Sequence, residues 1–227
     1  MTHRTRIKIC GLTRAADVAE AIAAGTDAVG FVFYPPSPRY VTPRQVGDLL
    51  RQMSPFVSAV GLFVNAMLAE VKEALRHAPI TLLQFHGDET PQQCADIAEQ
   101  VNLPFIRAIR VGTKTTSADL LKYENEYRSI SPLLSGLLLD TLVDSYGGGG
   151  KVFDWSVIPE NLAPRLVLSG GLSAQNATDA VSRVRPFAVD VSSGVESAKG
   201  IKDAVAIQRF IESVRHADTL PRQSRSS

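Results

Sequence analysis

The sequence has few cysteines, almost no net charge and no long apolar run, and each shortage excludes a class of protein. Two cysteines, Cys10 and Cys94, are too few for a disulfide framework or a zinc ligand set. The 24 basic and 23 acidic side chains leave a net charge of +1, so no basic face for nucleic acid is expected. Apolar runs such as residues 137–139 are far shorter than the roughly 18–20 residues of a membrane span. We therefore expect neither nucleic acid nor a membrane as a partner.

What remains has the composition of one globular domain. The chain has 227 residues, of which 44% are hydrophobic and 21% are charged. The six residues before Ile7 lead directly into an alternating apolar segment, which leaves no room for a signal or transit peptide. A reducing cytoplasm is the expected compartment.

Short aliphatic or β-branched runs alternate with segments of helical spacing along the whole chain. The predicted strands are residues 6–10, 28–33, 58–64, 81–86, 104–111, 136–140, 165–169 and 187–191. The predicted helices are residues 14–24, 43–53, 66–77, 92–101, 115–127, 174–184 and 201–215. Thr13, Thr42, Thr90 and Ser173 precede four of these helices as candidate N-terminal caps.

Eight strand–helix units without a long linker favour an α/β fold with a parallel eight-stranded core, a (β/α)8 TIM barrel. An open doubly wound sheet is the alternative. It usually has fewer strands and a glycine-rich loop after the first one, whereas the loop here begins Cys10-Gly11-Leu12-Thr13. We expect a barrel domain over residues 1–216 and a frayed polar tail over residues 217–227.

Glycines and small hydroxyl residues gather after the last three predicted strands, where such barrels carry their active sites. Their backbone N–H groups could approach a phosphate closely, although each glycine could also serve only a tight turn. A P-loop does not fit, because Val152 follows Lys151 where Ser or Thr is required. The candidate phosphate ligands are Gly148, Gly149, Gly150, Gly170, Gly171, Ser192, Ser193 and Gly194.

Cys10 and Asp140 each end a predicted strand and are candidates for an acid/base pair. Strand alternation places Lys8 on the same face as Cys10, where a cation favours the thiolate. The alternative is that Cys10 is a small buried hydrophobic residue. Asp140 closes an apolar strand, where burial would raise its pKa toward general-acid duty, unless it only caps the following loop.

Arg39 follows the second predicted strand in a proline-stiffened loop. Its guanidinium suits a substrate carboxylate, although a solvated surface arginine is the alternative. No set of His, Cys, Asp or Glu has metal-ligand spacing, and no Gly-x-Ser-x-Gly motif indicates a hydrolase. We therefore expect no metal and no cofactor.

Nine motifs in this order resemble those of the phosphoribosylanthranilate isomerase family. They extend over most of residues 6–215, and the first and last are together highly specific. The motifs are KICGLT at 8–13, VGFVF at 29–33, SPR at 37–39, GLFVN at 61–65, QFHG at 84–87, LLD at 138–140, FDW at 153–155, SGGL at 169–172 and VDVSSGVE at 189–196.

The resemblance implies a cofactor-free TIM-barrel isomerase of tryptophan biosynthesis. Its reaction would be an Amadori rearrangement of N-(5-phosphoribosyl)anthranilate to 1-(2-carboxyphenylamino)-1-deoxyribulose 5-phosphate. Cys10 would be the general base and Asp140 the general acid, Arg39 would hold the anthranilate carboxylate, and Asp190 would face the substrate. The glycine and serine loops would hold the phosphate.

Two departures and two rival functions qualify this expectation. Residues 147–150 are all glycine where the family usually has Gly-Gly-Thr-Gly, and Ser169 replaces a usual alanine. A sugar isomerase of histidine synthesis would use two aspartates, which Cys10 argues against. A barrel that binds a phosphometabolite without catalysis has no reason to keep both Cys10 and Asp140. The expected partner is a small phosphorylated molecule, bound by a monomer or a homodimer.

Overall fold

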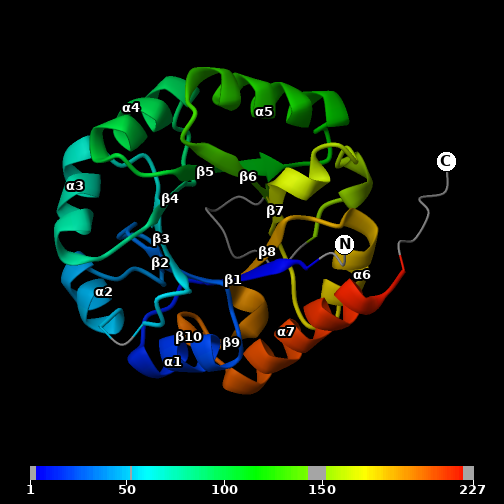
Figure 1. Cartoon of the computed structure of the whole chain (residues 1–227), viewed down its shortest axis with the longest axis horizontal. Coiled ribbons are helices and arrows are strands. Elements are labelled where there is room, and N and C mark those ends of the chain that lie inside the picture. Colours follow the sequence, from blue (N-terminus) through cyan, green and yellow to red (C-terminus); the bar gives the residue numbers. More distant parts are fainter. Residues whose placement is uncertain (1–3, 52, 143–151, 222–227) are drawn as a thin grey trace.

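Eight parallel strands close into a barrel in the computed structural model, which describes residues 4–51, 53–142 and 152–221 (Figure 1). Each strand pairs with its neighbour in sequence, and the register Arg6↔Ala188 joins the last strand to the first. The predicted (β/α)8 architecture is confirmed. The strands are β1 (Arg6–Cys10), β2 (Ala28–Val32), β3 (Ser58–Phe63), β4 (Leu82–Phe85), β5 (Phe105–Val111), β6 (Leu134–Thr141), β7 (Leu166–Leu168) and β8 (Ala188–Val191).

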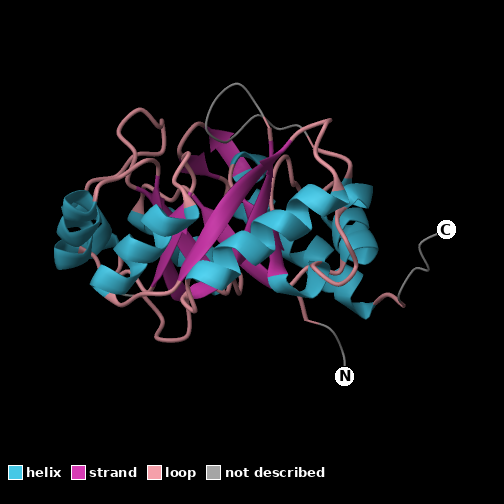
Figure 2. Cartoon of the chain, turned by 90° about the horizontal axis from the view of Figure 1, so that it is seen from above, coloured by secondary structure: helices cyan, strands magenta, loops and turns pink. Residues whose placement is uncertain are grey.

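Helices surround the strands, which run through the centre of the molecule (Figure 2). The seven predicted helices are all present, including the polar segment after β5. Among the described residues the sixth unit has only two short 3-10 turns, so the expectation of eight complete strand–helix units is wrong there. The α-helices are α1 (Ala15–Ala23), α2 (Pro43–Leu49), α3 (Leu68–His77), α4 (Pro91–Val101), α5 (Ser117–Ile130), α6 (Ala177–Val184) and α7 (Ala204–Thr219), and the 3-10 turns of the sixth unit are η1 (Trp155–Val157) and η2 (Ala163–Arg165).

Two of the four candidate caps are confirmed. The hydroxyls of Thr42 and Thr90 each accept a hydrogen bond from a backbone N–H in the first turn, with a proline at the next position. Thr13 does not cap α1, because its hydroxyl donates to the carbonyl of Gly200 at 2.6 Å. Ser173 does not cap α6 either, since that helix begins four residues later, at Ala177.

The last helix extends beyond the predicted domain boundary. Helix α7 runs to Thr219, and Ala217 within it is fully buried. The backbone N–H and hydroxyl of Thr5 donate to the Asp218 carboxylate at 2.9 and 2.7 Å. The predicted start of a frayed tail at residue 217 is therefore too early, and residues 222–227 lie outside the described residues.

The alternation of side chains along each strand divides the interior into two regions. In β1, Ile7 and Ile9 belong to the large apolar core between strands and helices, whereas Lys8 and Cys10 point into the barrel. A separate apolar cluster, which includes Ile106, fills another part of the barrel interior. Inside the barrel, the buried polar side chains of Gln84, Asp140 and Asp190 lie toward the carboxyl ends of the strands.

Candidate active site

A pocket opens at the carboxyl ends of the strands, as expected for this fold. Of the predicted site residues that the structure describes, all but Gly194 line this pocket. Gly148, Gly149 and Gly150 lie outside the described residues. The pocket is lined by Cys10, Val32, Tyr34, Ser37, Arg39, Leu62, Val64, Gln84, His86, Asp140, Thr141, Ser169, Gly170, Gly171, Leu172, Asp190, Val191, Ser192 and Ser193.

Cys10 shares the barrel mouth with a buried ion pair. Lys8 Nζ donates to Asp190 Oδ1 at 2.7 Å, and the Ser169 hydroxyl donates to the other carboxylate oxygen at 3.3 Å. Gly30 makes room for this arrangement, since a Cβ there would lie 2.9 Å from Cys10 Sγ and 3.0 Å from Lys8 Nζ. The Cys10 thiol and the Lys8 ammonium therefore both pack against Gly30, next to each other.

Burial raises the pKa of the Cys10 thiol, and the charge of Lys8 lowers it by a smaller amount. The cation acts in the direction that the sequence predicted, but it does not overcome the loss of solvent. Burial also opposes the charge on Lys8, yet the charge and hydrogen bond of Asp190, together with Cys10, outweigh it and the pKa of Lys8 is raised. At neutral pH the unliganded site therefore holds a protonated thiol beside a charged ammonium.

Asp140 lies in the same pocket and contacts a histidine from β4's end. His86 Nε2 is 3.2 Å from Asp140 Oδ2, and the Gln84 amide nitrogen is 3.0 Å from His86 Nδ1. The backbone N–H of Thr141 donates to Asp140 Oδ1 at 2.9 Å. Asp140 thus accepts a bond from the last residue of β6 and presents its carboxyl group to the pocket. The sequence placed His86 at a strand end but gave it no partner, because Asp140 is 54 residues away.

The loops after β7 and β8 meet at the pocket through glycines that no other residue replaces easily. Gly170 and Gly171 have φ of +84° and +65°, in the left-handed region. A Cβ on Gly194 would lie 1.9 Å from the carbonyl oxygen of Leu172. Gly194 therefore allows the two loops to lie against each other, and it is not among the residues that line the pocket.

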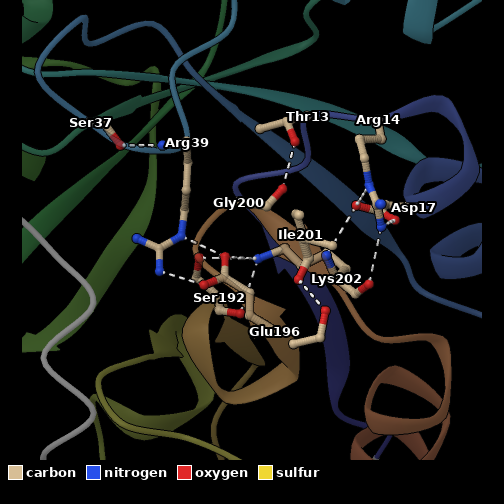
Figure 3. A network of polar contacts seen from close by, with 11 residues as sticks. Thr13, Arg14, Asp17, Ser37, Arg39, Ser192, Glu196, Gly200, Ile201 and Lys202 are labelled. Carbon is tan, nitrogen blue, oxygen red and sulfur yellow. Dashed lines mark hydrogen bonds and ion pairs between the residues drawn. The ribbon is translucent and has the colours of Figure 1, made fainter.

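Arg39 reaches the pocket but is not a free surface arginine. Its Nε and Nη2 donate to the two oxygens of Glu196 at 2.7 and 2.8 Å, and its side chain is 11% exposed (Figure 3). Lys202 Nζ donates to the same carboxylate at 2.9 Å. Burial raises the pKa of Glu196, but the bonds from Arg39 and the charge of Lys202 outweigh it, so the pKa is lowered. Sequence reasoning missed Glu196 and Lys202, since neither ends a barrel strand.

The structure gives no indication of a metal centre or a membrane span in the parts that it describes. Residues 4–51, 53–142 and 152–221 contain no group of three or more His, Cys, Asp or Glu side chains placed to hold a metal ion. No helix within those ranges is long and apolar enough to cross a membrane.

Comparison with known proteins identifies the family. The model of the N-(5'-phosphoribosyl)anthranilate (PRA) isomerase family matches residues 7–213. The chain belongs to this family. The N-(5'-phosphoribosyl)anthranilate isomerase of Herminiimonas arsenicoxydans is 67% identical over 218 residues, which are 96% of each chain. That of Ralstonia nicotianae is 54% identical over 225 residues, covering 95% of each chain.

Solved structures agree in fold and coverage. The phosphoribosyl anthranilate isomerase from Thermotoga maritima superimposes with a TM-score of 0.81 at 41% identity, over 93% of this chain and 99% of that chain. A phosphoribosyl anthranilate isomerase in complex with reduced 1-(o-carboxyphenylamino)-1-deoxyribulose 5-phosphate has a TM-score of 0.75 at 36% identity, with the same coverage. The predicted family and TIM-barrel fold are confirmed, and the chain is an aldose–ketose isomerase of tryptophan biosynthesis.

Proposed function

We propose that Cys10 and Asp140 are the base and acid that convert N-(5'-phosphoribosyl)anthranilate to its 1-deoxyribulose 5-phosphate product. The observation that carries this assignment is that both side chains line one pocket, with Arg39 and the loops after β7 and β8 around them. The pocket thus combines two groups that can transfer protons with two regions that can bind anions, as a substrate with a carboxylate and a phosphate requires.

The reaction needs one proton delivered and one removed. Asp140 in its acid form protonates the furanose ring oxygen, the C1–O bond breaks, and the anthranilate nitrogen forms a Schiff base with C1. Cys10 as thiolate then takes the C2 proton. The electron pair of that C–H bond forms the C1=C2 double bond, and the π pair of the C1=N bond moves to the nitrogen and neutralises it. The resulting enolamine tautomerises to the ketone. Lys8 supports this step because its charge stabilises the thiolate over the thiol.

Phosphate binding is assigned to the loops after β7 and β8. Gly170, Gly171, Ser192 and Ser193 line the pocket there, and small side chains leave their backbone N–H groups accessible to an anion. Gly148, Gly149 and Gly150 complete the predicted set from outside the described residues. Gly194 contributes indirectly, by allowing the loop after β8 to lie against Leu172.

Two further groups have supporting positions. Arg39 binds the anthranilate carboxylate through the part of its guanidinium that Glu196 leaves open. Asp190 lines the pocket and accepts the bond from Lys8, so it faces the substrate and keeps the ammonium charged beside Cys10.

We also propose a cytoplasmic enzyme whose partner is a small phosphorylated substrate and which is a monomer or a homodimer. A relative from Thermotoga maritima has been described as dimeric, and as having been converted to monomers. Light scattering on the purified chain across a range of concentrations distinguishes the two states.

The deciding assay follows the loss of substrate fluorescence after the protein is added to freshly made phosphoribosylanthranilate. Cys10→Ala and Asp140→Asn should each abolish most turnover, whereas Cys94→Ala is the matched control. Full activity in Cys10→Ala would return that thiol to a packing role and overturn the proposed mechanism.

A further inference from the structure

Glu196 holds two cations from different parts of the chain. Both of its oxygens accept bonds from Arg39, and one of them also accepts a bond from Lys202 at 2.9 Å. The side chains of Glu196 and Lys202 are 5% and 0% exposed. A buried charge cluster of this kind contributes little net stability, because the loss of hydration offsets the attraction. Its position beside the pocket therefore calls for a role other than stability.

The first consequence is that Arg39 has a fixed orientation. Glu196 takes the Nε and Nη2 atoms, which leaves Nη1 as the end of the guanidinium available to the pocket. The stem of Arg39 lies against Gly11, where a Cβ would come within 2.4 Å of Arg39 Cδ. Arg39 is thus held at its head by a carboxylate and along its stem by backbone.

The second consequence is that the same cluster holds the loop after β8. Lys202 Nζ donates to the carbonyl oxygen of Ser192 at 3.0 Å and lies 3.3 Å from its hydroxyl oxygen. Ser192 lines the pocket on the side assigned to phosphate. One buried ammonium therefore contacts both the loop that would bind phosphate and the carboxylate that orients Arg39.

The cluster itself is anchored to the first helix. Glu196 and Lys202 lie in a small hairpin of β9 (Glu196–Ala198) and β10 (Ile201–Lys202). The backbone N–H of Lys202 donates to Asp17 Oδ2 at 3.1 Å, and Asp17 is paired with Arg14 (Figure 3). The Thr13 hydroxyl donates to Gly200 between the two strands. These contacts join the hairpin to α1 and to the loop before it.

We propose that Glu196 and Lys202 are positioning residues that fix the separation between the carboxylate-binding and phosphate-binding ends of the active site. Glu196 acts through Arg39, and Lys202 acts through Ser192. The pair makes the pocket selective for substrates whose two anions lie that far apart. This inference rests on the proposed function, in which Arg39 binds the carboxylate and the loop after β8 binds the phosphate.

Two single variants separate the two halves of the proposal. Glu196→Gln keeps the shape but removes the charge that orients Arg39. We expect KM and the inhibition constant of anthranilate to rise by roughly tenfold, with kcat and sulfate inhibition within about twofold. Lys202→Met keeps most of the stem but frees Ser192, so sulfate inhibition should weaken by roughly tenfold and anthranilate inhibition should change less.

A double-mutant comparison tests whether Glu196 acts through Arg39. In an Arg39→Ala background, Glu196→Gln should have almost no further effect on KM, because the residue that it orients is gone. If each substitution instead raises KM by its own factor and the two factors multiply in the double variant, Glu196 does not act through Arg39 and the positioning role is overturned. The positioning role is also overturned if Glu196→Gln alone, with Arg39 present, leaves KM and anthranilate inhibition unchanged.

Controls separate this proposal from protein folding and from the proposed function. Glu73→Gln removes an acid that pairs with Arg76 and His77 on the surface and should leave every constant unchanged. Lys202→Arg keeps the charge and should restore sulfate inhibition if Lys202→Met folds poorly. If Arg39→Ala itself leaves KM and anthranilate inhibition unaltered, the assignment of Arg39 in the proposed function fails, whatever Glu196→Gln does.

Discussion

Two of the buried polar clusters lie across the barrel from each other, one at β1 and β8 and the other at β4 and β5, and they face opposite sides of the sheet. The inner cluster pairs Lys8 with Asp190 at 2.7 Å beside Cys10. The outer cluster pairs Arg107 of β5 with Glu89 at 2.9 Å, and Arg107 Nε also donates to the Tyr127 hydroxyl. Both ion pairs are buried to a similar extent. Only the inner one adjoins the pocket.

The difference between the two clusters follows from the alternation of side chains along a strand. Ile106 and Ala108 point into the barrel, so Arg107 between them points out toward α4 and α5. There it donates to the carbonyl oxygens of Phe85 and Gly87 at 3.0 Å and holds the loop after β4. A charged residue in a barrel strand therefore belongs to the pocket only when it lies on the inner face of the sheet.

The strongest test of this comparison is removal of the proposed acid and base. Cys10→Ala and Asp140→Asn should each lower kcat by about 10²–10⁴-fold, the usual size of a general acid–base contribution, with little change in KM. Steady-state kinetics on phosphoribosylanthranilate measures this. Cys94→Ala removes the cysteine on the helix side, where burial raises its pKa to about 12, and should leave kcat unchanged. An equal loss of kcat in Cys10→Ala and Cys94→Ala would show that a position on the inner face of the barrel does not decide which cysteine is catalytic.

A matched pair of variants compares the ion pairs directly. Lys8→Met and Arg107→Met each leave one buried carboxylate without its cation, which should cost about 3–5 kcal/mol in the free energy of unfolding. Urea denaturation measures the loss in both. The folded Arg107→Met protein should keep kcat within a few-fold of the parent, whereas Lys8→Met should not. A collapse of kcat in folded Arg107→Met would extend the active site to the outer cluster.

Arg39 sharpens the comparison because its pair with Glu196 is buried and yet belongs to the pocket. Arg39→Ala should cost roughly 1.5–3 kcal/mol in substrate binding, the worth of a hydrogen bond to a charged group. Arg39→Lys should recover only part of it, since an ammonium cannot hold Glu196 with two atoms. KM and the inhibition constant of anthranilate report the loss. Sulfate inhibition should persist in both variants, and its disappearance would mean that Arg39 binds the phosphate end.

The smallest expected effect is a shift in pH dependence. Burial raises the pKa of Cys10, so the thiolate fraction, measured as the rate at which iodoacetamide alkylates Cys10 in the Cys94→Ala protein, should increase as pH rises past the ordinary thiol range. Lys8 lowers that pKa, so the rising limb in Lys8→Met should move to higher pH. The matched Arg107→Met protein should keep the limb of the parent. A limb that stays in place in Lys8→Met would show that the cation does not act on the thiol.

The eight strands could be predicted from sequence because each is a short apolar run, and alternation in β1 correctly placed Lys8 with Cys10. The partners of the site residues could not be predicted. Glu196 is 157 residues from Arg39, and His86 is 54 residues from Asp140, so only the closed barrel brings them together. The prediction that Thr13 caps α1 is wrong for the same reason, because the hydroxyl donates to Gly200, which is 187 residues away in the sequence.

The pairing of Lys8 with Asp190 also has a consequence during synthesis of the chain. The two residues are 182 positions apart, and the ribosome adds about 5–20 residues per second, so Lys8 precedes its counter-ion by about 10–40 s. During that interval β1 has neither its charge partner nor β8 at its edge. The barrel therefore cannot close around the Lys8–Asp190 pair until β8 has been synthesised. Completion of the catalytic centre is thus one of the last steps in the folding of the nascent chain.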